Sequence, residues 1–150
     1  MLALMKKYLK IYPEGSCGNI HNLNLEEIGQ IINNSKYLFL TIGALYKNEK
    51  NLYQVADKAT YLKDAISIYR DTNTPKKFHA WITVDSGEII DLAHNMTMYQ
   101  LHKDKKDFFP ILGTPETITK KYGFIYEPYR IEGHITSDMH GKGDKLIIIN

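Results

Sequence analysis

The fold of this chain is decided by the stretch Phe78-His79-Ala80-Trp81-Ile82-Thr83-Val84-Asp85-Ser86-Gly87-Glu88-Ile89-Ile90-Asp91-Leu92. Two β-rich, apolar runs flank Asp85-Ser86-Gly87, which suits a three-residue loop built from a type I turn and a glycine with positive φ. A loop of this length sets Ile82 opposite Ile90. The stretch is therefore predicted to form an antiparallel β-hairpin.

Side chains alternate along a strand, so the hairpin has two faces. One face is wholly apolar and is predicted to be the core side, with Ala80, Ile82, Val84, Ile90 and Leu92. The other face carries His79 and Asp91, and we expect it to be a shared polar face that also holds Trp81, Thr83 and Ile89. The two polar residues are diagonal neighbours, about 7 to 8 Å apart between backbone positions, which leaning side chains can close to a hydrogen bond.

Composition limits the class of protein. A chain of 150 residues with 43% hydrophobic and 24% charged residues fits a single domain, residues 1–150, with one real core. The net charge of +2 is far from the clustered excess of a phosphate-neutralising protein, so a nucleic-acid partner is not favoured. Residues 1–7 contain no continuous apolar run, so neither a signal peptide nor a membrane span is expected. The predicted location is the cytoplasm, or the outside of the cell by a route without a classical signal peptide.

The rest of the chain adds helices and strands to the hairpin. Hydrophobic periodicity and capping residues predict helices over residues 2–12, 25–32 (capped by Asn24), 52–69, 96–102 (capped by Asn95) and 115–122 (between Thr114 and Gly123). Strands are predicted over residues 37–46, 124–131 and 145–149, with a polar segment at 132–144. The expected class is α+β, with a largely antiparallel sheet of about five strands and helices mostly N-terminal to it.

The chain has one cysteine, Cys17, so an internal disulfide is excluded. A catalytic cysteine needs a base to form its thiolate, and that base needs an acceptor on its other nitrogen to fix its orientation. In chain order, Cys17, His79 and Asp91 could supply the nucleophile, the base and the orienting group. The competing interpretation is a small buried thiol and a structural histidine without chemistry.

The order of these three residues resembles the papain-like and transglutaminase-like superfamily. There a cysteine precedes a strand-borne histidine, often in a context like His79-Ala80-Trp81, and an aspartate follows on the next strand; Ser16-Cys17-Gly18 is similar to its glycine-flanked nucleophile. The resemblance covers about residues 15–92. It implies a papain-like core, a Cys17 thioester, His79 as base and then acid, and Asp91 as orienter.

The same resemblance implies an amide hydrolase, glutamine deamidase or transglutaminase-like acyltransferase without metal or cofactor, acting on a protein or peptide. Trp81 would be a wall of the acyl site or a covering aromatic. No glutamine lies shortly before Cys17, so Asn19, Asn22 or backbone N–H groups would have to stabilise the oxyanion. The residues just after Cys17 are poor helix formers, so the first helix of this region is expected only from about Asn24.

Other classes of function have weaker motifs. His134-Ile135-Thr136 has the form of half of a two-histidine phosphoesterase, but His79-Ala80-Trp81 lacks the matching hydroxyl residue. His21, near Cys17, is an alternative base. Nitrogen and oxygen ligands in the polar segment could bind a metal through His134, Asp138 and His140. Eleven tyrosines also fit a non-enzymatic binding or inhibitor module of phage or bacterial origin.

Overall fold

The computed structural model describes residues 1–12, 17–22, 25–32, 37–68, 77–103, 106 and 108–136. In these residues the helices are α1 (Leu2–Ile11), α2 (Cys17–Asn22), α3 (Leu25–Ile31), α4 (Lys58–Ile68), α5 (Ala93–His102) and α6 (Pro115–Tyr122). The strands are β1 (Tyr37–Lys47), β2 (Lys50–Asn51), β3 (His79–Val84), β4 (Ile89–Asp91), β5 (Ile111–Gly113) and β6 (Phe124–Thr136). This confirms the predicted α+β class, with an antiparallel sheet and three helices before its first strand.

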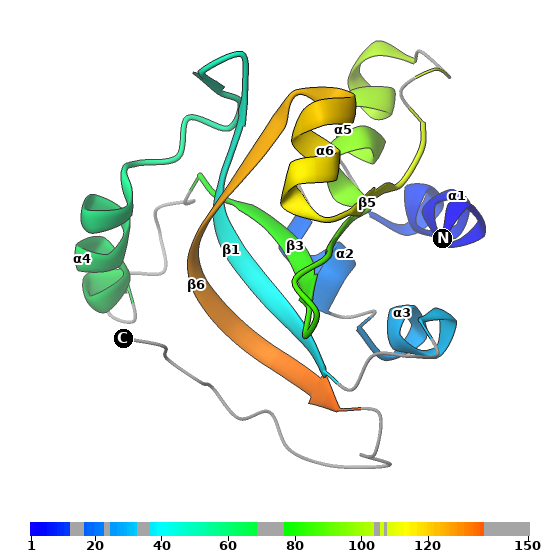
Figure 1. Ribbon diagram of the computed structural model, residues 1–150, viewed down its shortest axis with the longest axis horizontal. Helices are drawn as coiled ribbons and strands as arrows, with labels where there is room; N and C mark the ends of the chain where they lie inside the picture. The colour runs from blue at the N-terminus through cyan, green and yellow to red at the C-terminus, as the bar shows by residue number, and fades with distance from the viewer. Residues whose placement is uncertain are drawn as a thin grey trace.

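The sheet is organised around β1. Along one edge, β1 pairs with β6 over its whole length. Along the other edge, β1 pairs first with β3 and then, near its C-terminal end, with β2. The sheet then continues from β3 through β4 to β5. Figure 1 shows β1 and β6 curling together through the middle of the molecule, with α1, α2 and α3 on one side and α4 on the other. The apolar 37–46 segment is thus the central strand that its sequence predicts.

The hairpin has the predicted register. Ile82 pairs with Ile90, and the Val84 N–H donates a hydrogen bond of 2.8 Å to the carbonyl of Glu88. Gly87 closes the turn with a φ of 93°, a conformation that L side chains rarely adopt. The three-residue loop therefore fixes which residues of β3 and β4 lie on each face.

Both faces of the hairpin are buried, which corrects the expectation of one polar face. The predicted core face packs into the larger hydrophobic cluster with residues of α1, α2 and α3. The second face packs against α6 and the start of β6, while β5 extends the sheet beside β4. Its smaller cluster consists of Leu45, Trp81, Ile89, Ile111, Ile118, Phe124 and Tyr126. His79 and Asp91, each fully buried, lie inside the protein between these aromatic residues.

Three helix boundaries follow capping chemistry. In α6, the Thr114 hydroxyl accepts the Thr117 N–H at 3.3 Å and Gly123 ends the helix with a φ of 72°, as predicted. The prediction for α5 was wrong by three residues, because the helix begins at Ala93, next to the Asp91 carboxylate, and not after an Asn95 cap.

Two further expectations need correction. The helix predicted from residue 52 begins at Lys58, because β1 turns back into β2 through Asn48 and Glu49, whose φ values of 49° and 62° are those of a type I′ hairpin turn. Strand β6 continues to Thr136, into the segment predicted as a polar loop. The strand predicted at 145–149 lies outside the described residues.

Candidate active site

The Asp91 carboxylate is the centre of a buried hydrogen-bond network. Its Oδ2 accepts from His79 Nε2 at 2.6 Å and from the Tyr126 hydroxyl at 2.8 Å. Its Oδ1 accepts from the backbone N–H groups of Ala93 at 2.9 Å and His94 at 3.0 Å. Burial by itself would raise the pKa of Asp91, but the charge and hydrogen bond of His79 hold it below its ordinary value. Asp91 is therefore an ionised carboxylate with all its main acceptor positions in use.

The His79 ring is held by a hydrogen bond at Nε2 and by stacking on one of its faces. The ring stacks on Tyr53, with centroids 4.6 Å apart and planes 2° apart, and Trp81 lies 5.9 Å away. Burial lowers the pKa of His79, but the Asp91 carboxylate more than offsets this and raises it above its ordinary value. The ring is thus locked in one orientation and favours the protonated form.

Nδ1 of His79 is the one ring nitrogen left without a hydrogen-bond partner of ordinary geometry, although it is buried. The Cys17 thiol, beside this ring, is a smaller cause than Asp91 of the raised pKa of His79. The sulfur also donates a long hydrogen bond of 3.8 Å to the carbonyl of Phe78, the residue before His79. The structure therefore brings Cys17, His79 and Asp91 together in that spatial order.

Cys17 is the first residue of α2, which corrects the expectation that no helix begins before Asn24. The helix forms despite its poor propensity because it packs on β3 and buries Ile20 and His21. Gly18 lies against the Phe78 ring, at a distance where a Cβ would make an ordinary van der Waals contact. The thiol itself is 6% exposed.

His21 does not serve as the alternative base, because both of its ring nitrogens are in use. Its Nε2 accepts the Leu92 N–H at 3.1 Å, so that nitrogen carries no proton. Its Nδ1 lies 2.9 Å from the Cys17 carbonyl and therefore donates to it. Burial lowers the pKa of His21 to about 4, which agrees with a neutral ring. His21 ties α2 to the start of α5 and so positions Cys17.

The other predicted site residues occupy different environments. Asn19 is exposed on α2, two residues after Cys17, whereas Trp81 is only 1% exposed and packs edge-to-face on Tyr126. Trp81 is therefore a buried aromatic residue that packs beside the His79 ring. The side chain of Asn22, and all of Asp138 and His140, lie outside what the structure describes.

The metal alternative gains no support from the described part of the chain. No group of three or more His, Cys, Asp or Glu side chains there could hold a metal ion. The backbone of His134 pairs with Phe39 in the β1–β6 ladder.

Three residues of this network had no signal in the sequence. Tyr126 reaches Asp91 only because β6 pairs with β1, which sets Tyr126 opposite Leu45. Tyr53 and His94 meet through a hydrogen bond of 2.8 Å between the tyrosine hydroxyl and His94 Nδ1. These contacts depend on tertiary pairing across long sequence separations, and neither spacing nor composition encodes them.

Comparisons of the chain with models of known protein families, with curated proteins and with solved structures found no match. Among the helices that the structure describes, none has the length and apolar character needed to cross a membrane.

Proposed function

We propose that this protein is a cysteine-dependent acyl-transfer enzyme in which Cys17 is the nucleophile, His79 the base and acid, and Asp91 the orienting group. One observation carries the proposal: Nδ1 of His79 is buried without a partner beside the Cys17 thiol, while Nε2 is fixed by Asp91. A buried donor or acceptor without a partner costs about 1–3 kcal/mol, so its retention needs a reason. A thiolate at Cys17 would provide the missing acceptor for a protonated Nδ1.

The Asp91 network supports this assignment. A histidine that exchanges protons with a thiol must keep its tautomer and orientation through the reaction. The 2.6 Å bond to Asp91 and the Tyr53 stack supply both constraints. Tyr126 remains a donor to Asp91, because burial first, and then the Asp91 charge, raise its pKa well above the ordinary value. The aspartate is thereby kept ionised and fixed.

The proposed reaction has two acyl transfers. Cys17 Sγ attacks the carbonyl carbon of an amide or thioester, and the proton on His79 Nδ1 passes to the leaving amine or thiol as the bond to the carbonyl breaks. The acyl group then forms a thioester with Sγ. Water or an amine attacks this thioester and gives its proton to Nδ1, which releases the product and restores the sulfur. Water as the second acceptor gives hydrolysis of a backbone amide or, where the substrate is a glutamine side chain, deamidation, whereas an amine gives transfer.

The surroundings of the sulfur leave little of it open, because Cys17 is only 6% exposed. Asn19 is exposed two residues further along α2, but residues two apart on a helix do not face each other, so the helix gives no support to Asn19 as a donor to the substrate. Backbone N–H groups around Cys17 are therefore the donors that we assign to the oxyanion.

The proposal predicts a covalent acyl-enzyme. Incubation with p-nitrophenyl acetate should add one acetyl group to Cys17 in the intact-mass spectrum, and Cys17→Ala should remove it. His79→Gln should slow acylation by about 10²-fold or more, since general base catalysis is worth that much. His102→Gln, at the exposed end of α5, is the matched control and should react like the wild type. Equal labelling of wild type and Cys17→Ala would contradict the proposal.

A further inference from the structure

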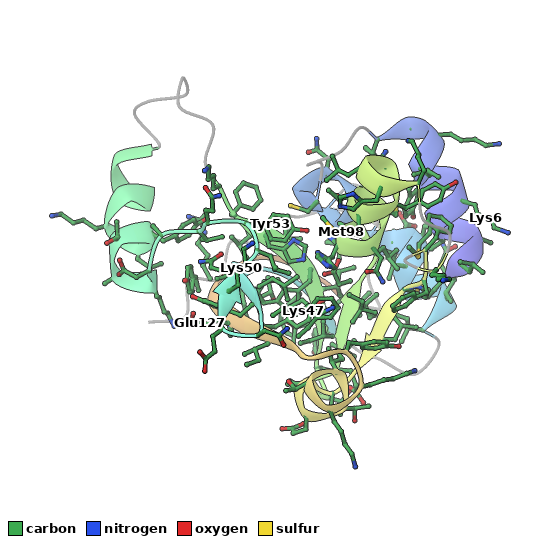
Figure 2. All side chains as sticks on the ribbon, turned by 90° about the horizontal axis from the view of Figure 1, so that it is seen from above. Lys6, Lys47, Lys50, Tyr53, Met98 and Glu127 are labelled. Atoms are coloured by element: carbon green, nitrogen blue, oxygen red, sulfur yellow. The ribbon has the colours of Figure 1, made fainter. Side chains whose placement is uncertain are left out.

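A pocket of about 540 Å³ lies in the molecule apart from Cys17, His79 and Asp91, none of which lines it. Its walls come from β1, β2, α5, α6 and β6, and three of its lining residues are lysines: Lys47, Lys50 and Lys121. No aspartate or glutamate is among the lining residues. Figure 2 shows Lys47, Lys50, Tyr53 and Met98 gathered on one side of the molecule, away from Lys6 on α1. The size is in the range of pockets that hold small molecules.

The three lysines bring positive charge together along the rim of the pocket. Lys47 and Lys50 are paired directly across the β1–β2 turn, where like charges are destabilising. Among the described residues, none of the three forms an ion pair with a carboxylate. All three lysines are exposed to solvent at the mouth of the pocket, where their ammonium groups can meet an anionic ligand.

The remaining wall is mainly aromatic. Phe109 and Tyr122 stack with centroids 5.2 Å apart and planes 28° apart, and Tyr53 and Phe124 are the other aromatic residues of the lining, beside Leu52, His94, Asn95 and Met98. The lysines lie close to these rings: Lys121 Nζ is 4.9 Å from the Tyr122 centroid, and Lys47 Nζ is 4.7 Å from that of Phe124. A ligand that touches the aromatic wall is therefore also within reach of the ammonium groups.

We propose that this pocket binds a nucleoside diphosphate or a closely related nucleotide, with its flat base against the aromatic wall and its phosphates between Lys47, Lys50 and Lys121. Lysine is a compact point charge suited to phosphate oxygens, and aromatic side chains stack on bases of any sequence. The proposal does not rest on Cys17 chemistry, because Cys17, His79 and Asp91 do not line the pocket, although Tyr53 and His94 of the surrounding network do.

The test is the binding of a fluorescent N-methylanthraniloyl ADP to the full chain, followed by anisotropy. We expect saturable binding, and a loss of about tenfold or more in affinity for Lys47→Gln and for Lys121→Gln, since a hydrogen bond to a charged group contributes about 1.5–3 kcal/mol. Lys120→Gln is the matched control, because Lys120 is exposed on the same helix but does not line the pocket. Its affinity should equal that of the wild type.

Competition separates the possible sources of the anion. Unlabelled ADP should displace the probe at lower concentrations than either pyrophosphate or adenosine, because only the nucleotide contacts both the aromatic residues and the lysines. Displacement by pyrophosphate as effective as by ADP would overturn the proposal, and so would tighter binding of a single-stranded oligonucleotide than of ADP. Absence of saturable binding, or equal losses for Lys120→Gln and Lys121→Gln, would also overturn it. Cys17→Ser should bind the probe normally, so this result is independent of the acyl-transfer test.

Discussion

Replacing Asp91 with alanine is expected to lower the free energy of unfolding by about 3–5 kcal/mol, the cost of breaking a buried ion pair by removing one partner. The carboxylate accepts hydrogen bonds from His79, Tyr126 and the N–H groups of Ala93 and His94. Its loss leaves the His79 ring with no acceptor at either nitrogen, and it also removes the cap at the start of α5. Urea unfolding at pH 7 measures the change.

Two variants give this experiment its controls. Asp91→Asn keeps the size of the side chain and one oxygen acceptor, so it should cost less stability than alanine while still removing the charge that raises the pKa of His79. Glu127→Ala removes an exposed carboxylate from β6 and should stay within about 0.5 kcal/mol of the wild type. An Asp91→Ala protein as stable as Glu127→Ala would show that the network contributes little.

The second large effect is a maximum of stability near pH 6.5. Burial lowers the pKa values of His21 and His94 from 6.5 to about 4. The unfolded chain therefore binds more protons than the folded one between these values, and stability falls as the pH decreases below about 6.5. Each histidine contributes at most about 1.4 kcal/mol per pH unit in this window.

His79 makes stability fall on the alkaline side of the maximum. Its pKa is raised in the folded protein, mainly by Asp91 against the effect of burial. This stabilisation is complete below the unfolded value of about 6.5 and is lost as the pH rises through the folded value. Asp91 keeps its contribution above pH 4, because its own pKa is lowered and this stabilisation is lost only in stronger acid.

Urea midpoints from pH 4.5 to 9 measure both limbs. His94→Gln should flatten the acid limb, because it removes one of the two histidines whose pKa is lowered by burial. A stability that keeps rising from pH 6.5 to pH 9 would contradict the raised pKa of His79. Stability independent of pH between 4.5 and 6.5 would contradict the neutral state of His21 and His94.

The local turn chemistry of the hairpin made its register and the His79–Asp91 contact predictable. Asp85-Ser86-Gly87 sets the pairing, and the pairing sets which side chains can meet, so the prediction needed no contact from outside the hairpin. Gly43, by contrast, has a role that no local pattern reveals. A Cβ there would overlap the Glu127 carbonyl and lie 2.8 Å from Trp81, because β6 and β3 both close on β1 at that point.

The less predictable features depend on packing between distant segments. Helix α2 begins at Cys17 because α2 packs on β3, which overrides the low helix propensity of Gly18 and Asn19. The burial of the second hairpin face requires β6, whose place beside β1 is fixed only in the folded sheet. The double role of Asp91, as partner of His79 and as cap of α5, likewise becomes visible only in three dimensions.

The central claim is that Cys17 is a nucleophile activated by His79. It is tested most directly by the rate at which iodoacetamide alkylates Cys17 in the folded protein between pH 5 and pH 8. Our account predicts that Cys17 reacts faster than free N-acetylcysteine at pH 6, and that His79→Gln abolishes this advantage. Alkylation no faster than that of the free thiol, at an equal rate in the wild type and in His79→Gln, would contradict it.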